Sequence, residues 1–186
     1  LLYLHAWDST TPVEEILRAM DDLVAAGKVV YLGLSDIPAW QAARIQAIAD
    51  LRGWSPMIAL QLEYNLIERS GDRDLIPMAR EMGMGVLPWS PLASGLLSGK
   101  YRRKDLEGRT DVQGRAAMAR QGSPMDDRTF GILDVQAEIA AETGQSPAAV
   151  ALAFLLSQSG IAAPIVGART LEQLQDNLAA LDFELE

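Results

Sequence analysis

The chain contains no cysteine and only one histidine among its 186 residues. Without cysteine there is no disulfide framework and no thiolate metal site, and a single histidine is too few ligands for a zinc site. We therefore expect no metal. No apolar run approaches the roughly 20 residues of a membrane span, and no signal-peptide pattern opens the chain. We expect a cytoplasmic protein that does not enter a membrane.

Positive charge is also scarce, because 16 Lys and Arg residues face 25 Asp and Glu residues and give a net charge of −9. Nucleic-acid binding requires a basic face, so we do not expect it. The one dense basic stretch, Lys100–Lys104, is by itself typical of a solvated loop. Hydrophobic residues make up 49% of the chain, which is enough for a core, and we expect residues 1–186 to form a single domain.

Short apolar runs alternate with helical periods along the chain. The runs are near-continuous, as in strands buried on both faces of a parallel sheet. They are Leu1–Leu4, Val29–Gly33, Ile58–Leu62, Gly85–Trp89 and Pro164–Val166. Helices are expected between and after them, at about 12–26, 38–51, 74–82, 127–142, 147–156 and 171–181. This alternation predicts an α/β fold with a parallel sheet.

Turn and cap residues predict where these helices begin and end. Thr11 is expected to cap the first helix, with Pro12 at its first position, Glu14 completing a capping box and Gly27 ending it. Ser146 and Thr170 are expected to cap two later helices. The apolar residues expected on the second helix are Trp40, Ala43 and Ile48, and those on the last are Leu171, Leu174, Leu178 and Leu181.

Two α/β architectures compete for this pattern. A doubly wound sheet usually shows a glycine-rich loop after its first strand, and no G-x-G-x-x-G occurs here. A barrel needs no such signature, but eight strands typically require about 250 residues. We therefore expect further strands upstream of residue 1. The segment 101–126 has no clean period and is expected to be a long loop.

Polar or aromatic residues follow each expected strand, where a barrel builds its active site. His5 ends the first strand, and a neutral imidazole can donate a hydrogen bond to a substrate oxygen. Ser35, Gln61 and Trp89 lie at or near the ends of the next three. Each residue alone also fits a structural role, as a satisfied histidine, a helix cap or a core aromatic. Their joint placement favours a site.

Several segments carry a resemblance to a known family. They are LYLHAWD, TPVEEILRAMDDLVAAGKVVYLGLSD, QLEYNLIER, GVLPWSPLASGLLSGKY, SPAAVALAFLL and PIVGARTLEQLQDNL, in that order along the chain. With them the chain resembles the aldo-keto reductase family. The resemblance implies a (β/α)8 TIM barrel, of which this chain carries about the last five strands. It also implies reduction of aldehydes and ketones to alcohols with NADP(H) bound in extended form.

The resemblance assigns roles residue by residue. His5 matches the histidine that orients the carbonyl. In the related potassium-channel β subunits this position looks like Asn, so His5 favours the reductase side of the family. Ser35 and Gln61 match the residues that bind the nicotinamide carboxamide, and Trp89 matches the aromatic beneath the ring. Trp7 is a candidate for the substrate side. Further cofactor positions are Ser90, Leu92, Ser94, Gly95 and Lys100 at the pyrophosphate, and Gly167, Arg169, Gln173, Asp176 and Asn177 at the adenosine end.

Two departures from the family pattern are visible in the cofactor set. Asp36 stands after Ser35 where many members have Asn or Arg, and Gln173 stands where some members have Arg. Arg169 still favours NADP(H) over NAD(H) through a 2′-phosphate contact. Either Arg109 or Arg115 is expected to reach the cofactor from the long loop.

The catalytic Asp, Tyr and Lys of the family lie upstream of the histidine strand, so their roles fall on no residue of this chain. The leading hypothesis is the carboxyl-terminal part of an NADP(H)-dependent reductase of small carbonyl compounds, with residues 1–186 inactive alone. The alternative is a truncated pseudoenzyme or a regulatory nucleotide-binding subunit. An incomplete barrel leaves open sheet edges that favour association, including as a homo-oligomer.

Overall fold

The computed structural model describes residues 1–101 and 126–185. The expected loop 101–126, with Arg109 and Arg115, lies almost wholly outside them. The described chain divides into two compact units, Leu1–Leu62 with Ser70–Leu87 and Glu63–Arg69 with Pro88–Glu186. Each unit is described by itself below.

The first unit is built on a sheet in which neighbouring strands follow one another in the sequence, in the order β1-β2-β3-β4. The strands are β1 (Leu2–His5), β2 (Leu32–Ser35), β3 (Met57–Glu63) and β4 (Gly85–Trp89), the last residues of β3 and β4 belonging to the second unit. They confirm four of the five expected strands. β2 begins at Leu32, later than expected, and Val30 and Tyr31 before it are exposed.

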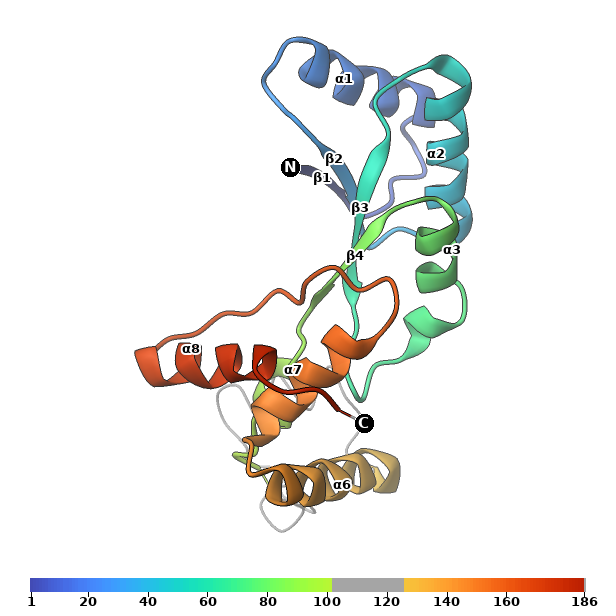
Figure 1. Cartoon of the computed structure of the whole chain (residues 1–186). Coiled ribbons are helices and arrows are strands. Elements are labelled where there is room, and N and C mark those ends of the chain that lie inside the picture. The colour runs from blue at the N-terminus through green and yellow to red at the C-terminus, as the bar shows by residue number, and fades with distance from the viewer. Residues whose placement is uncertain (102–125, 186) are drawn as a thin grey trace. The chain divides into compact units, whose positions relative to one another are not determined.

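Helices connect these strands as right-handed βαβ units normally require. They are α1 (Val13–Ala25), α2 (Ala39–Arg52) and α3 (Leu75–Glu81), with the short 3-10 helix η1 (Ser70–Asp72) before α3. α2 contacts both α1 and α3, so the three helices form one layer over the strands (Figure 1). The core of this unit lies between that layer and the sheet, where Leu17, Ile45 and Leu60 are fully buried.

The start of α1 differs from the expected capping box. Thr11 donates its hydroxyl proton to the Asp8 carboxylate, which also accepts from the Thr10 backbone N–H at 2.8 Å. Pro12 consequently occupies the cap position, and the prediction for Thr11 and Glu14 is wrong because a preceding aspartate competes for the threonine hydroxyl. The expected stop is confirmed, since Gly27 follows the helix with a φ of 68°.

The buried face of α2 is not the expected one. Trp40 is 63% exposed, while Ala42, Ile45 and Ala49 are buried together with Gln41 and Gln46. Gln46 can be buried because its amide is hydrogen-bonded: Oε1 accepts from the Met57 N–H at 3.0 Å, and Nε2 donates to Asp50 at 3.1 Å. The buried face of α2 thus includes a polar side chain that fixes the start of β3, and Trp40 lies outside that face.

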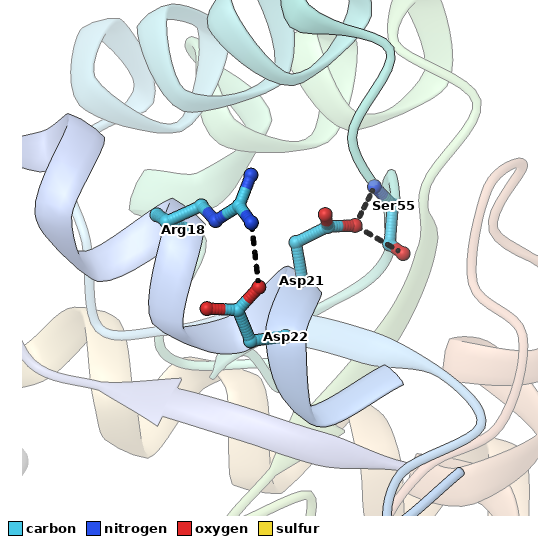
Figure 2. A network of polar contacts seen from close by, with 4 residues as sticks. All are labelled: Arg18, Asp21, Asp22 and Ser55. Atoms are coloured by element: carbon cyan, nitrogen blue, oxygen red, sulfur yellow. Dashed lines mark hydrogen bonds and ion pairs between the residues drawn. The ribbon is translucent and has the colours of Figure 1, made fainter. Parts of the chain in front are cut away.

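A second polar contact joins α1 to the chain entering β3 (Figure 2). The Asp21 carboxylate accepts hydrogen bonds from both the backbone N–H and the hydroxyl of Ser55, each at 2.8 Å. These bonds, the backbone one first, lower the pKa of Asp21. On the same helix Arg18 forms an exposed ion pair with Asp22 at 3.1 Å.

The second unit is helical. It contains η2 (Ala93–Ser98), α6 (Asp127–Thr143), α7 (Pro147–Ser157), α8 (Leu171–Leu178) and η3 (Ala179–Leu181). α7 contacts α6, α8, η2 and η3 and is buried along most of its length. The expected caps are confirmed, because Ser146 accepts from the Ala149 N–H at 3.0 Å and Thr170 accepts from the Gln173 N–H at 3.3 Å.

No single helix in the described part of the chain is long and apolar enough to cross a membrane. α6 and α7 taken together have the length and composition of a membrane span, but on these two criteria only, and they are bent by 97° at the break between them.

The expected fifth strand is absent from the structure, because Pro164–Val166 has no strand conformation. One backbone hydrogen bond, from the Ile165 N–H to the Pro88 carbonyl at 2.8 Å, places the segment beside the end of β4. The neighbouring Ile165 and Val166 are exposed, as are the four leucines expected on the apolar face of α8.

Candidate functional site

Three of the expected site residues are neighbours across the first three strands. His5 is the last residue of β1, Ser35 is the last residue of β2, and the register pairs His5 with Ser35 and Ser35 with Gln61. Paired residues of adjacent strands present their side chains on the same face of a sheet. The imidazole, the hydroxyl and the amide therefore form one row at the carboxyl end of the sheet.

The residue after three of the strands adopts a left-handed backbone. Ala6 follows β1 with a φ of 64°, Asp36 follows β2 with a φ of 52°, and Ser90 follows β4 with a φ of 52°. None of them is glycine, so each conformation costs roughly 1 kcal/mol. Backbone strain of this kind is concentrated at functional sites. The left-handed residue ends each of these strands immediately after a site residue, and nothing in the sequence indicates this conformation.

Ser35 is buried with its hydroxyl unsatisfied. The residue is 1% exposed, and its Oγ has no hydrogen-bond partner among the described residues. An unsatisfied buried hydroxyl costs about 1–3 kcal/mol. A carboxamide, with an N–H2 donor and a carbonyl acceptor, has the chemistry to satisfy this hydroxyl together with the Gln61 amide.

Tyr3 lies on β1, two residues before His5, and its ring packs against Gly33 of β2. A Cβ atom on Gly33 would lie 2.6 Å from Cε1 of Tyr3, so only glycine fits beneath the ring. Burial raises the pKa of the Tyr3 hydroxyl, and the nearby Gln61 side chain partly offsets that rise. The buried Tyr3 hydroxyl has no hydrogen-bond partner of normal geometry among the described residues, so Gln61 lies near it without forming a regular hydrogen bond.

His5 is 71% exposed and faces a carboxylate. Its Nε2 lies 3.3 Å from Oδ2 of Asp36, a residue that sequence reasoning noted only as a departure from the family pattern. Trp7, the candidate for the substrate side, makes an edge contact with Trp40 at a ring-centroid distance of 6.2 Å. That contact fixes Trp7 near the start of α2, and its role toward substrate stays a prediction.

A cavity of about 370 Å³ lies in the second unit. Its walls come from two segments far apart in the sequence, the 90–101 stretch after β4 and the 165–177 stretch that runs into α8. Nine expected cofactor residues line it: Ser90, Leu92, Ser94, Gly95, Lys100, Gly167, Gln173, Asp176 and Asn177. Arg169 and Trp89 are not among the lining residues. Sequence reasoning missed other lining residues, including Ser98, Tyr101 and Ala148.

The first wall of the cavity is a loop held in an unusual shape. Ser94 and Gly95 interrupt η2 with φ values of 55° and 96°, and the Ser94 N–H donates to the Ser90 hydroxyl at 3.3 Å. The fully buried Asn65 braces this loop, because its amide donates to the Ser90 carbonyl at 3.1 Å. Asn65 was not among the site residues expected from the sequence, since a brace between distant segments leaves no local pattern.

The second wall contains the start of α8. Gln173 has two roles there: its backbone N–H completes the Thr170 cap, and its side-chain Oε1 accepts from the Arg169 N–H at 2.9 Å. Among the described residues, the lining carries one cation, Lys100, and one carboxylate, Asp176. A ligand with separate anionic and hydrogen-donating parts matches this pairing better than a uniformly anionic one.

Comparisons with known proteins identify the family. A family model for the aldo/keto reductase family matches residues 1–186, and the chain belongs to that family. It is 35% identical over 186 residues to the uncharacterized oxidoreductase YrpG of Bacillus subtilis, covering 100% of this chain and 54% of that protein. It is also 35% identical over 190 residues to the aryl-alcohol dehydrogenase [NADP(+)] of Phanerodontia chrysosporium, covering 100% and 48%.

A third relative is the probable aryl-alcohol dehydrogenase AAD4 of Saccharomyces cerevisiae, 35% identical over 190 residues and covering 100% of this chain and 56% of that protein. The chain thus spans about half the length of the curated relatives it matches. Family membership implies a (β/α)8 barrel, and the four-stranded sheet with its helices is consistent with part of one. The resemblance inferred from the sequence is confirmed.

Proposed function

We propose that the protein is an oxidoreductase that reduces aldehydes and ketones to alcohols with NADP(H). The cavity carries the proposal, because it brings nine residues expected at the cofactor from two distant segments into one lining. The NADP(+) in the name of the Phanerodontia relative supports the choice of cofactor. The aryl-alcohol dehydrogenases among the relatives make aromatic aldehydes the first substrates to try.

The cavity has the size and polarity to hold the adenosine and phosphate part of such a cofactor. Its volume of about 370 Å³ is within the usual range of ligand pockets, roughly 300–1,000 Å³. The Lys100 ammonium would neutralise phosphate charge, and the hydroxyls of Ser90 and Ser94 would donate hydrogen bonds to it. Asp176 would accept from a hydroxyl or amino group, because a carboxylate accepts only.

The row at the strand ends would hold the reacting part. Ser35 and Gln61 would bind a carboxamide, as the unpartnered Ser35 hydroxyl suggests. The family resemblance assigns the contact with the ring itself to Trp89. The bound cofactor supplies the hydride. His5 would donate a hydrogen bond from Nε2 to the carbonyl oxygen and so stabilise the charge that grows there.

The proton that completes the alcohol is proposed to come from the family Asp, Tyr and Lys set, upstream of the histidine strand. Residues 1–186 alone are accordingly proposed to be inactive. We further propose that the protein works in the cytoplasm on small molecules, without nucleic acid.

The test uses the native full-length protein, with NADPH consumption and alcohol formation followed for benzaldehyde. We expect turnover, and we expect Lys100→Ala to raise KM several-fold for NADPH and NADH alike, because both cofactors carry the pyrophosphate whose charge Lys100 would neutralise. Arg80→Ala, on the exposed surface of α3, is the matched control. NADPH binding without turnover of any aldehyde would favour the regulatory subunit, and a folded protein that binds no NADPH would refute both.

A further inference from the structure

Asp36 provides a negative charge at the proposed carbonyl site, at a position where the family resemblance has Asn or Arg in many members. Its Oδ2 lies 3.3 Å from Nε2 of His5, the atom that would meet the substrate oxygen. We propose that Asp36 is a specificity-determining residue, which selects against carbonyl substrates that carry a negative charge near the carbonyl. This inference rests on the proposed reductase function and names the substrate class of the same site.

The backbone explains why Asp36 can reach His5. In a continuing strand the residue after Ser35 would point to the opposite face of the sheet. The left-handed φ of 52° at Asp36 breaks that alternation, and the carboxylate lies beside the imidazole at the end of the neighbouring strand. The conformation that ends β2 is therefore the feature that puts a charge into the row of site residues.

The chemistry of the pair favours the donor form of His5. A carboxylate only accepts hydrogen bonds, so its position beside Nε2 fits the tautomer in which that atom carries the proton. A carbonyl oxygen bound at Nε2 would share that N–H with Asp36. A substrate oxygen on Nε2 would thus lie a few ångströms from the Asp36 carboxylate.

This closeness decides which substituents a substrate can carry. A carboxylate within about 6 Å of Asp36 would be repelled, whereas a hydroxyl or amide N–H could donate to it. The side chains of His5 and Asp36 are 71% and 37% exposed, so solvent and salt weaken the repulsion without removing it. Neutral carbonyl compounds, and those with a hydrogen-bond donor near the carbonyl, are the favoured class.

The experiment compares two substrates of nearly equal size in the native full-length protein. They are 3-carboxybenzaldehyde, which is anionic at neutral pH, and its neutral amide 3-formylbenzamide. We expect kcat/KM to favour the amide in the wild type. Asp36→Asn should shrink the ratio between the two substrates about five- to tenfold, as expected for removal of one charge at this range and partial exposure.

Asp36→Asn is a suitable variant because asparagine matches aspartate in shape and also adopts left-handed backbone. Glu81→Gln is the matched control, since it removes one exposed charge at the end of α3 and so near the start of β4 rather than its carboxyl end. Added salt should reduce the wild-type ratio toward that of Asp36→Asn.

The outcomes separate this inference from the proposed function. Turnover of both aldehydes with the same ratio in wild type and Asp36→Asn would overturn the inference and leave the reductase proposal intact. An equal shift in Glu81→Gln would also overturn it, because the effect would then be one of net charge. Failure to reduce either aldehyde, or benzaldehyde, would count against the reductase itself.

Discussion

Gly33 should tolerate alanine only if the ring of Tyr3 is removed. A Cβ atom at position 33 would lie 2.6 Å and 2.8 Å from two ring carbons of Tyr3, and 3.0 Å from the Ala59 carbonyl oxygen. Overpacking of this kind typically costs about 1–3 kcal/mol. Alanine also lowers the entropy of the unfolded chain, which returns about 0.4–1 kcal/mol. We expect Gly33→Ala to destabilise the protein by about 1–2 kcal/mol.

The cause of that loss can be isolated by a double-mutant cycle. Tyr3→Ala removes the ring and makes space, so Gly33→Ala should cost clearly less in its presence, with a coupling of about 1 kcal/mol or more. Tyr3→Phe keeps the ring and should give no rescue. The measurement is urea unfolding of the full-length variants, compared at equal m-values so that only stability changes.

Gly131→Ala is a control that should change the stability in the opposite direction. Gly131 lies inside α6, and a Cβ atom there would meet nothing within 4 Å. Gly131→Ala should therefore stabilise the helix by up to about 1 kcal/mol. If Gly33→Ala were as harmless as Gly131→Ala, or equally costly with and without the Tyr3 ring, the placement of that ring over β2 would be refuted.

Three further predictions follow from single contacts. Hydrogen bonds led by that from the Thr10 side chain lower the pKa of Asp8 to about 2, so Asp8 contributes stability above its ordinary pKa of 3.8 and loses it as the pH falls toward 2; Thr10→Ala should move the pKa, read by carboxyl NMR, back toward 3.8. Gly99→Ala should lower the melting temperature, because a Cβ would lie 2.7 Å from Cγ of Pro147 and the φ is 78°; an unchanged value would contradict this contact. Gln136→Leu should cost about 1–3 kcal/mol in urea unfolding, because its Nε2 donates at 2.6 Å to the Pro147 carbonyl and this bond is lost; a neutral result would mean that the bond is not formed.

Local signals in the sequence predicted those parts of the fold that depend on local physics. Gly27 ends α1 because glycine accepts positive φ at little cost, and Ser146 caps α7 through its own hydroxyl. β4 was predicted at its observed bounds, since an apolar run between turn residues is itself a local pattern. The row of site residues could also be anticipated, because parallel strands end on the same side of a sheet.

The parts that could not be predicted depend on competition between distant groups. Trp40 at the start of α2 is exposed although it is a large aromatic, and Gln46 is buried because the start of β3 offers its amide a hydrogen-bond partner. The exposure of the α8 leucines and the irregular Pro164–Val166 segment likewise depend on what lies beside them. Asp36 has an ordinary sequence setting, and only the left-handed turn brings its carboxylate to His5.

The burial of α7 ties ligand binding to the integrity of the second unit. α7 contacts η2, which belongs to the first wall of the cavity, and α8, which belongs to the second. A ligand that contacts both walls binds only while α7 holds them in place. Ligand binding and the packing of α7 against the two walls therefore form one linked equilibrium. Backbone amides of α7 should then exchange with solvent more slowly as ligand is added, although no atom of the helix beyond its first turn, at Ala148, lines the cavity.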